Sequence, residues 1–444
     1  QVVCVAQDFS EMPTDSIWNL IFPQLVAAIL RHSTTLIFVN NRRLAERAAA
    51  KLNELFEGQE HMNNNYAVPQ PPPNFVPPVP KSGVYVQAYH GSMSRTAREK
   101  METDLKAGNL RVLVATSALE LGIDIGSVDL VIQLQSPKGI ARGLQRVGRS
   151  GHLVSATSKG RIYVTHREDL IESTVVAKAM QEHAIEETRI PRDCLDVLAQ
   201  QIVSMVSVEE WNIDELFDLV RQSYCYHSLS KKIFTSVVQM LAGRYTNEAF
   251  RELRPRISWI KVHNSLSALP GSSHLAITNA GTIPNRGYYG VYLEDLKTKV
   301  GEVDEEFIYE SRTGDTFILG SNVWKMVEID ANKIVVAPAP GQPARMPFWK
   351  GEAIGRTFEL GERVGKFLEE VSAGSIQTPE WLRENFPIDS HSARNILEYV
   401  HQQKDATKVV PTHRALVVEG FRDEIGDPRI VVHSCFGRGV NGLL

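Results

Sequence analysis

The run Gln145-Arg146-Val147-Gly148-Arg149-Ser150-Gly151-His152 organises this chain. If the run is helical, its two arginines lie on one face, and its two glycines let the backbone approach whatever the arginines touch. No acidic residue occurs between Leu130 and Arg167. The basic residues in that interval are Lys138, Arg142, Arg146, Arg149, Lys159, Arg161 and Arg167. Such a concentration of positive charge needs an anion, for which phosphate is well suited. The alternative is a solvated basic face.

The composition limits the class of protein. A chain of 444 residues is long enough for about two to four domains, and its 43% hydrophobic and 23% charged residues are typical of globular proteins. The net charge of −4 means that any site for a polyanion must be a local patch. Four widely spaced cysteines without a Cys-x-x-Cys pair favour buried thiols in a reducing compartment. We see no signal peptide, no membrane-spanning run and no His-x-x-x-His pair, and therefore expect a cytoplasmic protein without a metal site of its own.

Strands and helices are expected to alternate through the first 170 residues. The expected strands cover residues 34–39, 84–89, 111–115 and 130–134, and the expected helices cover residues 17–30, 44–55 and 94–107, the last with Ser94 as its N-cap. This alternation predicts a doubly wound parallel sheet. Polar residues at Asn40, His90 and Thr116 follow three of the strands and should lie at the carboxyl edge, where ligands bind in such sheets. The proline-rich segment at about 57–82 is predicted to be a surface insertion.

Three segments of this first region carry a family resemblance. Val114-Ala115-Thr116 through Gly122-Ile123-Asp124-Ile125 resembles motif V of superfamily-two helicases, Gln145 to Gly151 resembles motif VI, and Phe38-Val39-Asn40 resembles motif IV. The order and spacing of the three agree with that family. Gly151-His152, where most families have Gly-Arg, points to the Lhr (large helicase-related) group, and later segments agree with it.

The resemblance implies roles in nucleotide chemistry. Arg149 is expected to be the arginine finger that brings positive charge to the γ-phosphate of ATP. Arg146 would support Arg149 or pair with a carboxylate, and Gln145 would orient nearby groups. Gly122 and Asp124 resemble the residues that approach the ribose. His152 stands where many relatives place a second γ-phosphate arginine, and we assign it no role.

The resemblance also implies contacts to nucleic acid. Thr116, with its hydroxyl and backbone N–H expected to be free, resembles a contact to phosphates. Trp349, beside Lys350 in a loop rich in Pro and Gly, suits stacking on an unpaired base, and Ile283 could be a second wedge; packing in a local core is the alternative for Trp349. The full set expected to contact nucleic acid is Asn40, Arg42, His90, Ser92, Thr116, Ile283 and Trp349.

Part of a motor is missing from the sequence. No G-x-x-x-x-G-K-[ST] loop occurs anywhere, and no Asp-Glu-x-His follows a hydrophobic strand. Since those elements belong to the first RecA-like domain, we expect that domain to precede Gln1 and to bind most of the ATP and its Mg²⁺. We expect this chain alone not to hydrolyse ATP.

The rest of the chain predicts two further domains. Helical spacing around Leu198, Leu216 and Val237 indicates three short helices, which resemble the winged-helix domain of Lhr proteins. Ser230 is expected to cap the third helix, with Ile233 on its apolar face. After about residue 260, short β-rich runs, the first at residues 275–279, suggest a small antiparallel sheet or barrel, followed by helices. The predicted fold class is α/β, with a RecA-like parallel sheet domain at 1–170, a connector helix and winged-helix domain at 171–260, and a β-rich α+β domain at 261–444.

These features predict the C-terminal part of an ATP-dependent helicase or translocase, with 3′-to-5′ polarity on single-stranded DNA and a role in DNA repair. The expected partners are its own upstream RecA-like domain and single-stranded DNA or an RNA:DNA hybrid, with no membrane. The alternative is a scaffold module that binds nucleic acid without motor activity. A metabolic α/β enzyme is a third possibility, but no nucleophile, acid–base pair or glycine-rich fingerprint supports it.

Overall fold

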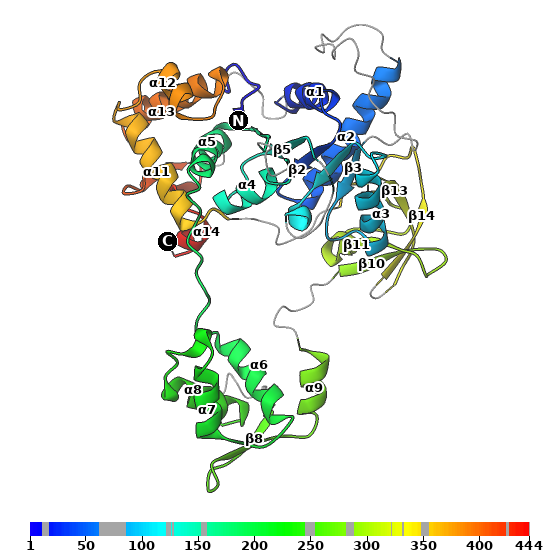
Figure 1. The fold of residues 1–444 in the computed structure, drawn as a ribbon, viewed down its shortest axis with the longest axis vertical. Coiled ribbons are helices and arrows are strands. Elements are labelled where there is room, and N and C mark those ends of the chain that lie inside the picture. Colours follow the sequence, from blue (N-terminus) through cyan, green and yellow to red (C-terminus); the bar gives the residue numbers. More distant parts are fainter. Residues whose placement is uncertain are drawn as a thin grey trace. The chain divides into compact units, whose positions relative to one another are not determined.

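The computed structural model describes residues 1–10, 17–61, 86–120, 126, 128–151, 158–244, 254–280, 288–320, 322–330, 333–347, 355–422 and 426–443. The chain forms two compact units, one made of Gln1–Glu186 with Gly287–Leu444 and the other of Glu187–Arg286. Figure 1 shows the elements of both units coloured along the sequence. The predicted insertion at 57–82 begins within helix α2 (Arg42–His61), and the part from residue 62 on lies outside the described residues.

A six-stranded parallel sheet lies at the centre of the first unit. Its order is β1 (Val2–Val3), β6 (Gly160–Tyr163), β5 (Leu130–Leu134), β2 (Thr35–Phe38), β4 (Val112–Ala115) and β3 (Val86–Tyr89). Because strand side chains alternate between faces, Ile37 and Val114 enter one apolar core while Phe38 and Leu113 enter another. Burial on both faces explains the nearly continuous apolar strand sequences. The predicted parallel sheet is confirmed.

Helices connect these strands close to the predicted positions. They are α1 (Ile17–Leu30), α2 (Arg42–His61), α3 (Arg95–Lys106), the short 3-10 helix η1 (Ser117–Leu119), α4 (Ile140–Val147) and α5 (Arg167–Gln181). The predicted cap of α3 is present, because the Ser94 side chain accepts a hydrogen bond from the Ala97 N–H at 3.3 Å. The connections place the loops after β2, β3, β4 and β5 at one edge of the sheet.

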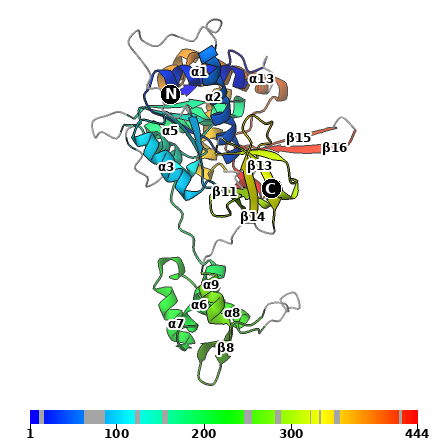
Figure 2. The same cartoon turned by 90° about the vertical axis from the view of Figure 1, so that its right-hand side faces the viewer.

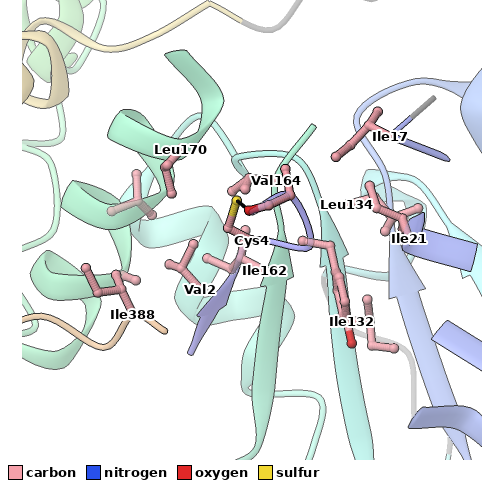
Figure 3. Packing of buried hydrophobic residues seen from close by; sticks show 14 of the residues in the cluster. Val2, Cys4, Ile17, Ile21, Ile132, Leu134, Ile162, Val164, Leu170 and Ile388 are labelled. Atoms are coloured by element: carbon pink, nitrogen blue, oxygen red, sulfur yellow. Dashed lines mark hydrogen bonds between the residues drawn. The ribbon is translucent and has the colours of Figure 1, made fainter. Parts of the chain in front are cut away.

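Three helices late in the chain pack beside the first strand of the sheet. They are α11 (Phe358–Ser372), α12 (Pro379–Asn385) and α13 (Ser390–Thr407), and their apolar faces belong to the same core as β1 and α5. The Val2 N–H donates to the Pro387 carbonyl at 2.7 Å. Figure 3 shows Val2, Cys4, Leu170 and Ile388 packed together there. Burial raises the pKa of the Cys4 thiol to about 12, as expected of a core cysteine.

A second sheet in the same unit has the order β11 (Lys299–Asp304), β10 (Tyr288–Leu293), β14 (Lys333–Pro338), β13 (Asn322–Ile329) and β12 (Thr316–Leu319). We call it the β-rich sheet. Helix α10 (Glu305–Tyr309) follows β11. The sheet is mixed and not wholly antiparallel as predicted, because β10 and β14 are parallel. A separate hairpin of β15 (Val417–Arg422) and β16 (Pro428–His433), clear in Figure 2, precedes α14 (Arg438–Asn441).

The second unit is the predicted winged-helix domain. It contains α6 (Leu195–Val206), α7 (Ile213–Arg221), η2 (Tyr224–Tyr226), α8 (Lys231–Leu241) and α9 (Ser272–Thr278), with a sheet of β7 (Trp211–Asn212), β9 (Ser265–Ala268) and β8 (Ile257–Ile260). The side chain of Ser230 caps α8, as predicted, but Phe234 fills the core while Ile233 is 42% exposed.

Two sequence predictions about this region differ from the structure. Residues 275–279 were expected to be a strand, but Ser272–Thr278 is helix α9. Short apolar runs do not distinguish a strand from a helix, and here Gly271 starts the helix with a φ of +85°. The expected boundary at 260 falls between β8 and β9, which pair with each other, and the unit continues to Arg286.

Candidate functional site

Helix α4 (Ile140–Val147) contains Gln145 and Arg146, the first two residues of the basic run Gln145–His152. Arg146 lies on this helix with only 1% of its surface exposed. Its Nε and Nη2 donate to Glu120 Oε1 at 2.8 and 2.6 Å, and its Nη1 donates to Gln133 Oε1 at 2.7 Å and Asn40 Oδ1 at 3.2 Å. The guanidinium group also lies 5.3 Å from the ring centroid of Phe38. Arg146 thus joins the ends of β2 and β5 to the loop after β4.

The charge of Arg146 is matched inside the fold. Burial lowers the pKa of the guanidinium, while the carboxylate of Glu120 acts in the opposite direction. Arg142 lies 3.7 Å from the same carboxylate. The observed pairing of Arg146 with a carboxylate is one of the two roles expected for it. Glu120 holds the arginine helix to the sheet and so has a structural part in the site.

Arg149 lies one turn beyond Arg146, directly after the last residue of α4 and its C-cap Gly148. Its N–H donates to the Arg146 carbonyl at 3.1 Å. The turn that follows is fixed, because Ser150 Oγ donates to the Val147 carbonyl at 2.8 Å and accepts from the Lys159 N–H at 2.9 Å. Arg149 is partly buried and Gln145 is exposed. The backbone that carries Arg149 is therefore held on both sides.

The loop between β5 and α4 is anchored by acidic residues from elsewhere in the first unit. The fully buried Asp169 accepts from the Ser136 N–H at 2.6 Å and from the Thr165 N–H at 2.9 Å, and burial raises its pKa. Glu172 binds Lys138 at 3.1 Å and Arg356 Nε at 2.6 Å. These contacts support a loop in which Gln135 and Lys138 adopt left-handed φ angles of 66° and 62°.

The other side of the same edge is closed by the β-rich sheet. His90 and Ser92 are buried, and His90 Nε2 lies 2.9 Å from Glu46 Oε1. That carboxylate oxygen also accepts from the Gly320 N–H at 2.6 Å. The Ser92 carbonyl accepts from the Glu302 N–H at 2.6 Å. His90 and Ser92 thus join two sheets in this conformation, which differs from the expected direct contact with nucleic acid.

Gly301 allows this close approach, because a Cβ there would lie 2.5 Å from the Ser92 carbonyl oxygen. Arg42 belongs to the same junction. Its Nη1 donates to Ser92 Oγ, and its guanidinium group lies 5.4 Å from the ring centroid of Tyr288. Asn40 is partly buried and donates from Nδ2 to the Ser136 carbonyl at 2.7 Å, in addition to accepting from Arg146. Both side chains have defined structural partners.

Thr116 differs from its prediction in one respect. It starts η1 at the end of β4, as expected of the loop residue, but its N–H is not free, because it donates to the Tyr89 carbonyl at 3.2 Å. The pairing of β3 with β4 continues one residue further than the sequence indicates, and this extension uses the N–H. The Thr116 side chain does not cap η1.

The remaining predicted site residues, Gly122, Asp124, His152, Ile283 and Trp349, lie outside the described residues. Among the residues that the structure describes, no cluster of three or more His, Cys, Asp or Glu side chains could hold a metal ion. Separately, α4 and the turn after it carry Arg142, Arg146 and Arg149, whose guanidinium groups are donors of the kind that bind anions such as phosphate. No helix in the described ranges is long and apolar enough to cross a bilayer.

Sequence reasoning missed the residues that hold α4 in place, chiefly Glu120, Gln133, Asp169, Glu172 and Arg356. Only Glu120 had a usable signal, since it lies in the loop after β4 that was already expected beside the arginines. Arg356 is 184 residues from its partner Glu172 and gave no local signal.

Two family models match the chain. Residues 77–153 match the helicase conserved C-terminal domain, and residues 178–346 match the winged-helix domain of the large helicase-related protein. The first match includes the loop after β4 and helix α4, and the second includes the whole of the second compact unit.

Relatives with curated names cover nearly the whole chain. It is 40% identical over 449 aligned residues to a Lhr helicase/probable uracil glycosylase of Mycolicibacterium smegmatis, a match that covers 98% of this chain and 30% of the relative. It is 34% identical to the ATP-dependent helicase Lhr-Core of Methanothermobacter thermautotrophicus, covering all of this chain and 49% of the relative. This chain thus spans about half the length of that relative and less than a third of the first.

A solved structure is similar over the full length of the chain. The Mycobacterium smegmatis helicase Lhr bound to single-stranded DNA and AMP-PNP superposes with a TM-score of 0.72 at 35% identity. The match covers all of this chain and 50% of that one.

Proposed function

The chain belongs to the large helicase-related (Lhr) family, and from this premise we propose that it supplies the second motor domain of an ATP-dependent helicase that moves along nucleic acid. We keep residues 1–170 for the RecA-like domain, and we move the end of the connector and winged-helix domain from residue 260 to Arg286, so that the β-rich domain covers residues 287–444. Because the chain spans only part of its relatives, the motor activity is proposed for a longer chain.

One observation carries the proposal. Arg146 is fully engaged by Glu120, Gln133 and Asn40, and this network fixes the helix from whose end Arg149 emerges. An arginine finger requires a guanidinium group at a position set in advance, because reorientation during the reaction would cost part of its effect. The geometry supports two separate roles, in which Arg146 holds the helix and Arg149 contacts the γ-phosphate of ATP.

Hydrolysis of the phosphoanhydride bond between the β- and γ-phosphates of ATP would drive movement. This chain would contribute only part of the ATP site. Arg149 would place positive charge at the γ-phosphate, where negative charge must be stabilised during transfer. Gln145, exposed on α4, would orient groups beside it. Gly122 and Asp124 would approach the ribose. We assign most of the binding of ATP and of Mg²⁺ to a preceding RecA-like domain, because the G-x-x-x-x-G-K-[ST] loop that cradles phosphates does not occur in this sequence.

Single-stranded DNA is the proposed track, with 3′-to-5′ movement and an RNA:DNA hybrid as a further substrate. The solved relative bound to single-stranded DNA supports the choice of single-stranded DNA as the track. We retain Thr116, Trp349 and Ile283 as proposed contacts. Arg42 and Asn40 would act mainly by holding the loops, since both have structural partners. His90 and Ser92 are withdrawn from the contact set because His90 pairs with Glu46, while the hydroxyl and the carbonyl of Ser92 are bonded to Arg42 and Glu302.

The proposal is tested by comparing ATP hydrolysis in this 444-residue chain with that of a longer chain carrying a preceding RecA-like domain. We expect DNA-stimulated hydrolysis only in the longer chain. Robust turnover by the 444-residue chain would contradict the assignment. For the track, Trp349→Ala should weaken binding of single-stranded DNA without changing the melting temperature. A large loss of thermal stability would instead place Trp349 in a core.

A further inference from the structure

We propose that Glu186 is a positioning residue for Arg149, because its carboxylate caps the helix that carries the arginines. Glu186 Oε1 accepts from the Ile140 N–H at 2.5 Å, and Oε2 accepts from the Ala141 N–H at 3.0 Å. Both N–H groups belong to the first turn of α4, where no earlier carbonyl of the helix can reach them. The inference rests on the proposed function of Arg149.

The cap comes from a distant part of the sequence. Helix α4 begins after Gly139, whose backbone is extended and which has no side chain to bond the first turn. Helices usually take such a cap from the residue that precedes them. Here the carboxylate lies 46 residues away from Ile140. Its negative charge also suits the positive end of the helix dipole.

Gly139 leaves room for this arrangement. A Cβ at Gly139 would lie 3.3 Å from Glu186 Oε1, closer than side chains ordinarily pack. Further along the same helix, a Cβ at Gly143 would lie 2.6 Å from the sulfur of Met180. Helix α4 therefore packs closely against α5 and receives its cap from the segment that follows α5. The two contacts set its position at two points.

Glu186 is also the last residue of the first compact unit, and the winged-helix unit begins at Glu187. The segment that leads into that unit thus carries the group that fixes the start of α4.

The first experiment measures amide hydrogen exchange in the 444-residue chain for peptides covering the start of α4. Glu186→Ala should accelerate exchange of the Ile140 and Ala141 amides by roughly two- to thirty-fold, the range expected for a lost helix cap. Glu186→Gln keeps one acceptor oxygen and should give an intermediate rate. Glu187→Gln, at the exposed neighbouring position, is the matched control and should leave exchange unchanged.

The second experiment measures ATP hydrolysis by the same variants in the longer chain. Because an arginine finger acts mainly in the transition state, Glu186→Ala should lower kcat by about tenfold or more and change KM for ATP by less than about twofold. Partial recovery of kcat in Glu186→Gln should follow its partial recovery of exchange protection. If Glu186 had a purely structural role, its variants would contain less folded protein, but kcat would not fall in the order wild type, Glu186→Gln, Glu186→Ala.

Two results would overturn the inference. Unchanged exchange at Ile140 and Ala141 in Glu186→Ala would show that the cap does not hold the helix. Accelerated exchange with unchanged kcat would show that the cap does not position Arg149. Failure of the proposed function itself is distinguishable, because the longer wild-type chain would then show no DNA-stimulated ATP hydrolysis whatever the exchange data.

Discussion

The two sides of the carboxyl edge of the parallel sheet carry similar kinds of polar residues but use them differently. On the closed side, made by Arg42, Glu46, His90 and Ser92, the side chains bond to the β-rich sheet or to each other. On the arginine side, made by Glu120, Gln133, Arg142, Arg146 and Arg149, carboxylates hold the helix while Gln145 is exposed beside them.

The difference shows how much can be predicted from the rule that ligands bind at the carboxyl edge of a parallel sheet. The carboxyl ends of parallel strands gather loops that are free of the sheet's own hydrogen bonding, so polar side chains meet there. Whether they meet a ligand depends on what else covers the edge. On the closed side the β-rich sheet covers the edge, and His90 and Ser92 contribute to the contacts between the two sheets. Substitutions on the two sides should therefore affect different properties.

The largest effect should follow loss of Arg149. In the longer chain, Arg149→Ala should lower ATP hydrolysis by about a thousandfold or more, since the finger charge would be absent from the transition state. The free energy of unfolding of the 444-residue chain should change by less than about 1 kcal/mol, as measured by urea titration. A large loss of stability with little loss of hydrolysis would place Arg149 among the structural residues.

Loss of Arg146 should reduce the stability of the chain. Arg146→Ala would leave the carboxylate of Glu120 with Arg142 alone, at 3.7 Å, and the amide oxygen of Gln133 without its donor, and breaking a buried pair costs about 3–5 kcal/mol of unfolding free energy. Urea titration of the 444-residue chain measures this loss. Arg146→Lys is the control, since it keeps the charge but lacks the planar fork, and it should recover only part of the stability. Full recovery would mean that charge alone holds α4.

On the closed side, Glu46→Ala should destabilise the chain by about 2–4 kcal/mol, because the buried His90 ring and the Gly320 N–H both lose an acceptor. Glu54→Ala on the same helix is the matched control. The pair of Glu54 with Lys51 is exposed and should contribute less than about 1 kcal/mol. Equal small losses in the two variants would show that the junction is not held by Glu46.

Local sequence signals predicted the framework well. The β-branched strands, the caps at Ser94 and Ser230 and the helix spacing in the second unit depend on residues close in the chain, and these features are present. The same reasoning failed for residues 275–279, where a short apolar run fits either a helix or a strand.

Contacts between distant segments were beyond the reach of the sequence. Gly320 is 274 residues from Glu46, and nothing near His90 indicates that another sheet would cover it. The interval from Leu130 to Arg167 lacks acidic residues, which suggested that its charges needed an external anion. Three of them, on Lys138, Arg142 and Arg146, are matched by Glu172 and Glu120 from outside the interval. An excess of one charge in sequence therefore overestimates the charge available to a ligand.

The smallest effect should be a pH dependence at Glu172, which anchors the loop before α4. Burial raises the pKa of this carboxyl, but the charges of Arg356 and Lys138 outweigh burial and leave the pKa below its ordinary value of 4.5. A lowered pKa in the folded state means that the stabilisation is complete above pH 4.5 and is lost as the pH falls through the lowered value. Glu172→Gln should therefore reduce the unfolding free energy at pH 7 and lessen its decline in acid. Glu398→Gln, a substitution at an exposed position of helix α13, should leave the decline unchanged. If the unfolding free energy of Glu172→Gln declined in acid as steeply as that of the wild type, this ion pair would not contribute to holding the loop.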